Sequence, residues 1–119
     1  MIQEAIYTTV NPIVPAFPLI GDIDVEKPFS IYSVNQNPMY TKEGITGYDN
    51  IVQISVIDDD VSVVVEKGKE VRDAVLALEG EVNGTTIDFS VFVTSDVRYD
   101  ERNGAYINMI QINIYTQNE

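Results

Sequence analysis

The sequence predicts an α+β domain: a four-stranded, mainly antiparallel sheet with a long helix and a short N-terminal helix packed on one face. Alternating apolar and polar residues mark four strands, and apolar residues spaced by three and four mark two helices. These elements follow the order helix, strand, strand, helix, strand, strand, for which helices on one face of a sheet are the economical packing. The 119 residues are enough for a single domain spanning 1–119.

The N-terminal part is predicted to be a short helix followed by a connector. A helical spacing of apolar residues over 2–9 predicts a helix that ends before Pro12. Residues 11–26 contain three prolines and a glycine, so we expect an irregular connector there. Its apolar members are expected to hold it against the core: Ile13, Val14, Phe17, Leu19 and Ile20.

Two strands are predicted next, separated by a loop. Apolar and polar residues alternate over 28–35, where the proline at the start is compatible with a strand, and again over 50–57. The intervening segment 36–49 contains one proline and two glycines, which predicts a long loop.

The second half is predicted to be the long helix and a hairpin. From Val61, apolar positions step by three and four, and Gly80 follows just beyond the last of them: Val64, Val65, Gly68, Val71, Val75 and Leu78. About 18 residues make a helix roughly 27 Å long. Strands are predicted at 86–94 and 105–116, with Asn103-Gly104 at the turn between them. The first of these strands is predicted to place four apolar residues on one face: Ile87, Phe89, Val91 and Val93.

The composition excludes several classes of catalytic site. The chain has no cysteine, histidine or tryptophan. A disulfide, a thiolate nucleophile, a Cys/His zinc site and a His-based triad are therefore impossible.

The charge bears on possible partners. Nineteen acidic against seven basic residues give a formal charge of −12. Tight binding to nucleic acid or to an anionic membrane surface is disfavoured, because both need an excess of lysine and arginine. The sequence also lacks an apolar run long enough to span a bilayer, and it lacks the basic start of a secretory signal. We therefore expect the protein to reside in the cytoplasm of the cell that makes it.

Two acidic segments are candidate cation sites. Asp58-Asp59-Asp60 could supply oxygen ligands, but acids at the start of a helix also cap it and favour the helix dipole, which is the interpretation we prefer. Residues 96–104 resemble a cation loop in composition only, because the alternating ligand spacing of a calcium loop is absent. We expect a solvated hairpin tip there, and no metal or other cofactor.

No residue pattern marks a catalytic centre. With 19 acids, some carboxylate pair always qualifies for glycosidase chemistry on paper, and no serine, threonine, lysine or tyrosine is marked as activated. We therefore expect no enzymatic activity, with a carboxylate-bound metal enzyme kept as an alternative.

Exposed aromatic and apolar residues on loops predict an interface with other proteins. Such side chains commonly anchor protein interfaces, although they can also fold back onto the core. The candidates come from the 36–49 segment and the following hairpin tip: Met39, Tyr40, Ile45, Tyr48, Val97, Arg98, Tyr99 and Arg102.

The arrangement resembles the small tail-completion (tail-terminator, head–tail joining) proteins of long-tailed bacteriophages. The likeness runs over nearly the whole chain, including the short N-terminal helix, the proline-containing connector and the acids before the long helix. One departure is Ile107, where many relatives have a basic residue. The segments that carry the likeness are Pro28-Phe29 to Tyr32, Gly44-Ile45-Thr46-Gly47-Tyr48, Val52 to Val56, Asn83-Gly84, Asp96 to Asp100, and Gly104-Ala105-Tyr106.

The resemblance implies a structural virion protein without catalytic activity. Such a protein forms a ring, expected to be a hexamer, that caps the tail tube and joins it to the portal–connector assembly. It would be made in the bacterial host cytoplasm and would reside at the head–tail junction. Double-stranded DNA would pass through the lumen, and the −12 charge would let it slide without specific binding.

A second class of protein also fits the charge. A small acidic binding protein that imitates DNA could occupy the basic site of a nucleic-acid enzyme and inhibit it. The acids are scattered over every segment rather than arranged along one face, which counts modestly against this alternative.

Overall fold

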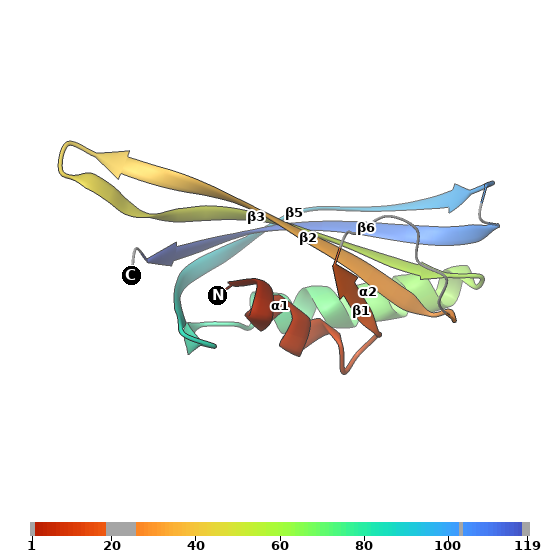
Figure 1. The fold of residues 1–119 in the computed structure, drawn as a ribbon. Helices are drawn as coiled ribbons and strands as arrows, with labels where there is room; N and C mark the ends of the chain where they lie inside the picture. Colours follow the sequence, from red (N-terminus) through yellow and green to blue (C-terminus); the bar gives the residue numbers. More distant parts are fainter. Residues whose placement is uncertain (1, 19–25, 103, 118–119) are drawn as a thin grey trace.

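The structure is a computed structural model that describes residues 2–18, 26–102 and 104–117. It contains a six-stranded sheet in the order β1-β2-β3-β6-β5-β4, with two helices packed against one face (Figure 1). The helices are α1 (Ile2–Val10) and α2 (Val61–Leu76). The strands are β1 (Ala16–Pro18), β2 (Phe29–Thr41), β3 (Gly44–Asp58), β4 (Gly80–Val82), β5 (Thr85–Asp100) and β6 (Ala105–Gln117).

The predicted four-stranded, antiparallel sheet with a long helix is wrong. The sheet has six strands and is mixed, because β1 pairs in parallel with β2. Both helices are short, with 9 and 16 residues, and four long strands dominate the molecule. The two additional strands have three residues each, too few to produce a recognisable alternation. The predicted connector 11–26 thus contains a strand, and its Leu19 and Ile20 lie outside the described residues.

The segment 36–49, predicted as a long loop, is instead the outer part of a β-hairpin (Figure 1). β2 and β3 pair from Phe29 with Ile57 out to Thr41 with Gly44, with one register shift between Met39 and Tyr40. Most side chains in this part are exposed. A strand that is solvated on both faces needs no apolar alternation, so the sequence carries no strand signal there. Gly44 completes the turn at a φ of 114°, which glycine adopts without steric cost.

Two bulges in β5 change which of its side chains face the helices. Register shifts lie between Ile87 and Phe89 and between Phe92 and Thr94. Each bulge leaves one residue without an opposite neighbour and reverses the side-chain alternation. Ile87 is therefore buried, whereas Phe89 is 56% exposed. The prediction that four apolar residues of this strand share one face is therefore wrong. These residues are Ile87, Phe89, Val91 and Val93.

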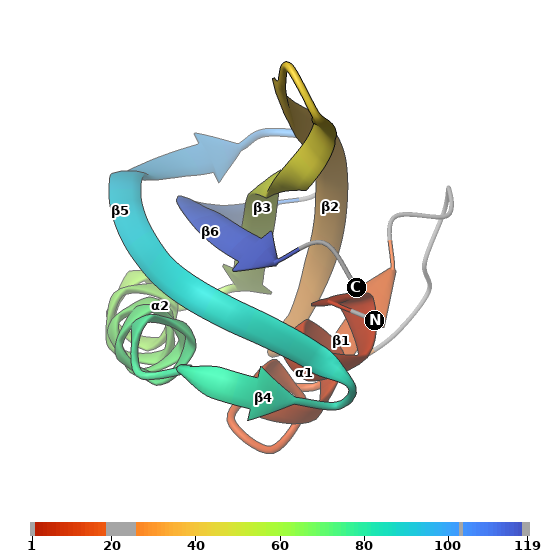
Figure 2. The same ribbon diagram turned by 90° about the vertical axis from the view of Figure 1, so that its left-hand side faces the viewer.

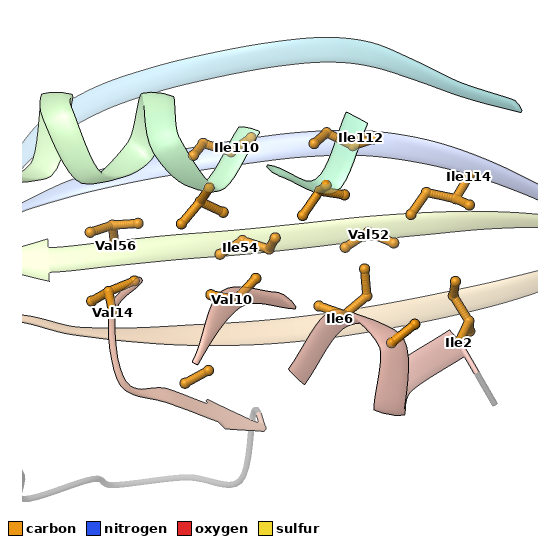
Figure 3. Packing of buried hydrophobic residues seen from close by; sticks show 14 of the residues in the cluster. Ile2, Ile6, Val10, Val14, Val52, Ile54, Val56, Ile110, Ile112 and Ile114 are labelled. Atoms are coloured by element: carbon orange, nitrogen blue, oxygen red, sulfur yellow. The ribbon is translucent and has the colours of Figure 1, made fainter. Parts of the chain in front are cut away.

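The hydrophobic core lies between the two helices and the middle of the sheet. Figure 3 shows side chains of α1 and of the segment after it facing those of β3 and β6. Helix α1 buries Ile2, Ala5, Ile6 and Val10, which confirms the predicted first helix and its apolar face. Helix α2 buries Val64, Gly68, Val71 and Val75 as predicted, but Val65 is 49% exposed. No helix in the described residues is sufficiently long and apolar for a bilayer crossing.

The sheet curls around the helices at its β4 end. Figure 2, which looks along the strands, shows β5 curving from β4, beside the helices, up to the edge of the sheet opposite β2. The β4–β5 turn is formed by Asn83 and Gly84, both at positive φ, as in a two-residue hairpin. Asn83 Nδ2 donates a hydrogen bond to Thr8 Oγ1 of α1 at 3.2 Å, which ties this end of the sheet to the helix layer. The opposite face of the sheet, which carries Ser33, Gln53 and Gln111, is called the helix-free face below.

The Asp58-Asp59-Asp60 cluster begins α2, as predicted. Asp60 is the N-cap: its Oδ1 accepts hydrogen bonds from the Ser62 backbone N–H at 2.9 Å and from the Ser62 hydroxyl at 2.8 Å. Asp58 Oδ2 accepts from the Asp60 N–H at 3.0 Å, and Asp59 forms an ion pair with Lys27 at 2.8 Å. Within residues 2–18, 26–102 and 104–117, no group of three or more acidic side chains is placed to hold a metal ion.

The Asp60 cap makes a pH-dependent contribution to stability. Hydrogen bonds from the Ser62 hydroxyl and backbone hold the pKa of the Asp60 carboxyl below its ordinary 3.8. A pKa lowered in the folded state stabilises the protein fully above the unfolded pKa, and this stabilisation is lost as the pH falls through the folded pKa. We expect Asp60→Ala to lower the Tm at neutral pH, with the deficit shrinking below pH 3.8.

Calorimetric melts from neutral to acidic pH would measure this effect. Asp60→Asn keeps a side-chain acceptor and is the matched control: it should retain most of the neutral-pH Tm. An Asp60→Ala variant with an unchanged Tm at neutral pH would contradict the capping role.

Candidate interaction surfaces

The residues predicted to form an interface lie at two opposite ends of the molecule. The molecule measures 50 × 23 × 22 Å, and its strands run along the long axis. The β2–β3 tip lies at one end and the β5–β6 tip at the other (Figure 1). The structure therefore divides the predicted residues into two sets: Met39, Tyr40, Ile45 and Tyr48 at the first tip, and Val97, Arg98, Tyr99 and Arg102 at the second.

At the β2–β3 tip, two of the predicted side chains project into solvent. Tyr40 is 70% exposed and Ile45 is 38% exposed. Met39 and Tyr48 are half-buried. The tip is held by the ladder between the strands and by a hydrogen bond of 3.4 Å from Thr46 Oγ1 to the Met39 carbonyl. Tyr40 and Ile45 are thus the side chains that a partner at this end would contact first.

At the β5–β6 tip, an aromatic pair and an ion pair are exposed together. Tyr99 packs edge-on against Tyr106, with ring centroids 5.0 Å apart, and still exposes 55% of its surface. Arg98 forms an ion pair with Asp96, two residues earlier on the same strand. Arg102 is exposed in the turn, where its N–H donates to Asp100 Oδ1 at 3.0 Å. This tip offers a partner an exposed aromatic ring and exposed arginine side chains.

A third surface, the outer edge of β5, was not predicted from the sequence. Strand β4 pairs with β5 only at Thr85–Ile87. From Asp88 to Tyr99, no described strand lies beside the outer edge of β5. Phe89, Val91 and Val93 on this stretch are 56%, 45% and 46% exposed. One signal in the sequence could have indicated this edge: the 16 residues of β5 contain no proline or glycine. Such a strand is unusually long, and only β6 pairs with it along its length.

The outer edge of β2 is a fourth surface. Strand β1 covers it only at Ser30–Tyr32, so no described strand lies beside Ser33–Thr41 on that side. The Ser30 N–H donates outward to the Pro15 carbonyl at 2.7 Å, so even-numbered residues of β2 direct their N–H groups outward. Pro38 is one of these even-numbered residues, but proline has no N–H group. The outward-pointing donors therefore lie before Pro38.

Two hollows accompany these edges. A groove of about 570 Å³ crosses the helix-free face and is lined by polar and apolar residues of four strands, including Ser33, Gln53, Asp96, Met109 and Gln111. A smaller hollow of about 200 Å³ lies between α2 and β5, lined by Val65, Arg72 and Val97 among others. In the groove, the Ser95 hydroxyl donates to Asn108 Oδ1 at 2.9 Å and Asp96 is paired with Arg98, so these two neighbours are not arranged as a nucleophile and its base.

One tyrosine near the groove has a perturbed pKa. Partial burial raises the pKa of the Tyr32 hydroxyl above 10.0, and the neighbouring Tyr7 raises it further. Tyr32 therefore remains protonated at neutral pH and is not an activated nucleophile.

The fold itself has a known counterpart. A chain in the solved structure of the virion of a native gene transfer agent (GTA) particle superimposes with a TM-score of 0.78. The match covers 98% of this chain and 94% of that chain, at 13% sequence identity. The two chains share a fold. The sequence matches no protein-family model and no curated protein.

Proposed function

We propose that this protein is a structural virion protein of a phage or phage-like particle, and that it forms the tail-completion ring that caps the tail tube and joins it to the head–tail connector. The observation that carries the proposal is the shared fold with a chain of the GTA virion over 98% of this sequence. The sequence resemblance to tail-terminator proteins, which covers nearly the whole chain, supports the finer assignment.

The distribution of exposed surfaces supports a ring subunit. Such a subunit has a copy of itself on each side, a tail-tube partner at one end and a connector partner at the other. In the part of the chain that the structure describes, the outer edges of β2 and β5 are open on the two sides of the molecule, and exposed aromatic tips lie at its two ends. We propose a hexamer, in which Tyr40 and Ile45 contact one axial partner and Tyr99 and Arg102 contact the other.

The charge distribution supports a lumen that does not hold DNA. Four of the basic side chains are neutralised locally in ion pairs: Lys27 with Asp59, Lys67 with Glu70, Arg72 with Asp73, and Arg98 with Asp96. The middle of the helix-free face is formed by uncharged side chains such as Gln53, Ser55 and Gln111. Double-stranded DNA meets few free cations on such a surface, so we propose that it passes without specific binding. We propose no catalytic activity.

A gene deletion in the producing bacterium tests the proposed role. Without the protein, DNA-filled heads and free tails should accumulate separately, and electron micrographs of the lysate should show very few joined particles. The wild-type gene supplied in trans should restore joining. Joined particles at the normal frequency in the deletion strain would contradict the proposal.

Imaging of the purified protein tests the ring. Negative-stain images of concentrated protein should show rings, and light scattering should give six times the 13.3 kDa of the monomer. A protein that instead forms a stable complex with a nucleic-acid enzyme as a monomer would favour the acidic inhibitor.

A further inference from the structure

We infer that the outer edge of β5 in one copy pairs with the outer edge of β2 in the next copy, so that the sheet continues from subunit to subunit. This inference rests on the proposed ring function and specifies its lateral interface. It commits to a second copy of this chain as the partner and to main-chain hydrogen bonds between antiparallel strands as the chemistry.

The edge of β5 has the features of a pairing template. Over Asp88–Tyr99 it presents backbone groups to solvent without a neighbouring strand among the described residues. Monomeric proteins usually protect such an edge with charged side chains, proline, a bulge or a covering segment. The charged residues of this stretch are Asp88, Asp96 and Arg98, and its two bulges enclose Phe89–Phe92, which contains no charged residue and no proline. Phe89 and Val91 in this segment are 56% and 45% exposed. This apolar segment is the part of the edge to which a strand can be added.

The edge of β2 is the complementary partner. Residues 33–41 contain no charged side chain, so a second chain of net charge −12 meets no additional repulsion there. The long strands alternate in direction across β2, β3, β6 and β5. Two copies with the same orientation along the strands therefore place β5 antiparallel to the β2 of the neighbour, which continues the alternation. Pro38 ends the run of outward donors and so limits how far the pairing extends.

The open parts of the two edges lie at the same level along the strands. Asn35 pairs with Ile51, Ile51 with Asn113, and Asn113 with Val91. Val91 and Asn35 therefore share one level across the sheet. By the same registers, Ser33–Asn37 of β2 lies level with Phe89–Thr94 of β5, and neither stretch has a neighbouring strand on its outer side among the described residues. A simple rotation between copies brings the two stretches together without a lengthwise shift.

The side chains at these levels would also be covered by the pairing. Phe92 and Val34 share a level on the helix side of the sheet. Phe92 is 39% exposed, and the Arg72 guanidinium lies 5.6 Å from its ring centroid. An added β2 strand would bring Val34 beside this ring. Main-chain bonds would supply affinity, and this side-chain contact would supply specificity.

Pairing of two different edges generates a ring. Each copy uses its β5 edge toward one neighbour and its β2 edge toward the other, so the contact repeats until the rotation closes. Pairing of β5 with β5 would instead stop at a dimer and leave both β2 edges open.

Cysteine cross-linking distinguishes these arrangements, because the chain has no native cysteine. Val91→Cys and Asn35→Cys place single thiols on the helix-free face, one on each edge. Facing side chains on paired antiparallel strands have Cβ atoms about 4.5–5.5 Å apart, close to disulfide geometry. Under mild oxidation, the mixture of the two variants should form a disulfide-linked dimer that neither variant forms alone. Ser33→Cys and Asn37→Cys against Val91→Cys would then determine the register.

Each other outcome overturns the inference in a recognisable way. Cross-linking of Val91→Cys with itself would show β5–β5 pairing. Rings in electron micrographs without cross-links from any edge pair would overturn the edge pairing and leave the ring function standing. Joined particles at the normal frequency in the deletion strain would overturn the ring function itself.

A charge on the β5 edge gives an independent test. Val91→Lys, with its folding verified by circular dichroism, should abolish the rings, because an edge lysine opposes strand addition. Val61→Lys introduces the same change at a comparably exposed site, 42% against 45%, on α2. This control should keep the rings. Loss of rings in both variants, or in neither, would contradict the β5 interface.

Discussion

Replacement of Gly68 by alanine should lower the free energy of unfolding by about 1–3 kcal/mol, as overpacking of a core does. The usual effect of this change in a helix is the opposite, a gain of roughly 0.5–1 kcal/mol. The sign reverses here because α2 crosses β6 at Gly68, and an alanine Cβ would overlap the amide nitrogen of Asn108. That amide donates to the Val64 carbonyl at 2.9 Å, and its oxygen accepts from the Ser95 hydroxyl at 2.9 Å, so it has little freedom to move.

A double-mutant cycle in chemical denaturation isolates this contact. In an Asn108→Ala background, Gly68→Ala should be neutral or stabilising, since the obstructing amide is gone. Lys69→Ala, at an exposed position next along α2, is the control for helix propensity and should change stability little. Equal losses from Gly68→Ala with and without Asn108 would refute the steric explanation.

The same contact bears on the proposed interface. Asn108 links α2, β6 and β5 through Val64 and Ser95. Ser95 lies within the open stretch of β5, whose outer edge has no described neighbouring strand. The Asn108 amide therefore fixes the course of β5 from its inner side. An edge that must receive another subunit has to be held in this way, because a mobile strand would lose conformational entropy on pairing.

Sequence patterns predicted the elements that bury one face. Val52, Ile54 and Val56 alternate in β3, and the apolar residues of α1 recur at helical spacing, because each set faces the core. The outer halves of β2 and β3 carry no such pattern, because both of their faces meet solvent. The bulges in β5 were equally invisible, since a bulge is set by pairing with β6 and not by local sequence.

The candidate surfaces were predicted in part. Exposed residues such as Tyr40 and Tyr99 could be selected because aromatic side chains in polar segments are conspicuous. Their separation to opposite ends of the molecule could not be predicted, because it depends on the length of the strands between them. The open edges of β2 and β5 depend on strand order, which arises from contacts between residues distant in sequence.

A buried amide in the centre of the sheet provides the second large effect. Asn50 on β3 is fully buried. Its Nδ2 donates to the Ile114 carbonyl at 2.9 Å and to Thr116 Oγ1 at 3.1 Å, and its Oδ1 accepts from Gln36 Nε2 at 3.0 Å. The amide thus links β2, β3 and β6 at the point where the sheet leaves the core and extends toward the β2–β3 tip. Both its donor and its acceptor functions are used.

Asn50→Asp should therefore lower the free energy of unfolding at neutral pH by about 3–5 kcal/mol, the range for an uncompensated buried charge. A carboxylate cannot donate to Ile114 or Thr116, and burial raises its pKa above the unfolded value of about 3.9. The deficit should hence be small below this unfolded pKa and grow as the pH rises toward the folded pKa.

Denaturation at several pH values measures this deficit in the free energy of unfolding. Asn37→Asp is the control, because the same change at an exposed residue of β2 alters the net charge equally. A deficit independent of pH would indicate that lost packing, not the buried charge, destabilises the variant. A deficit equal to that of Asn37→Asp would show that the amide network does not hold the three strands together.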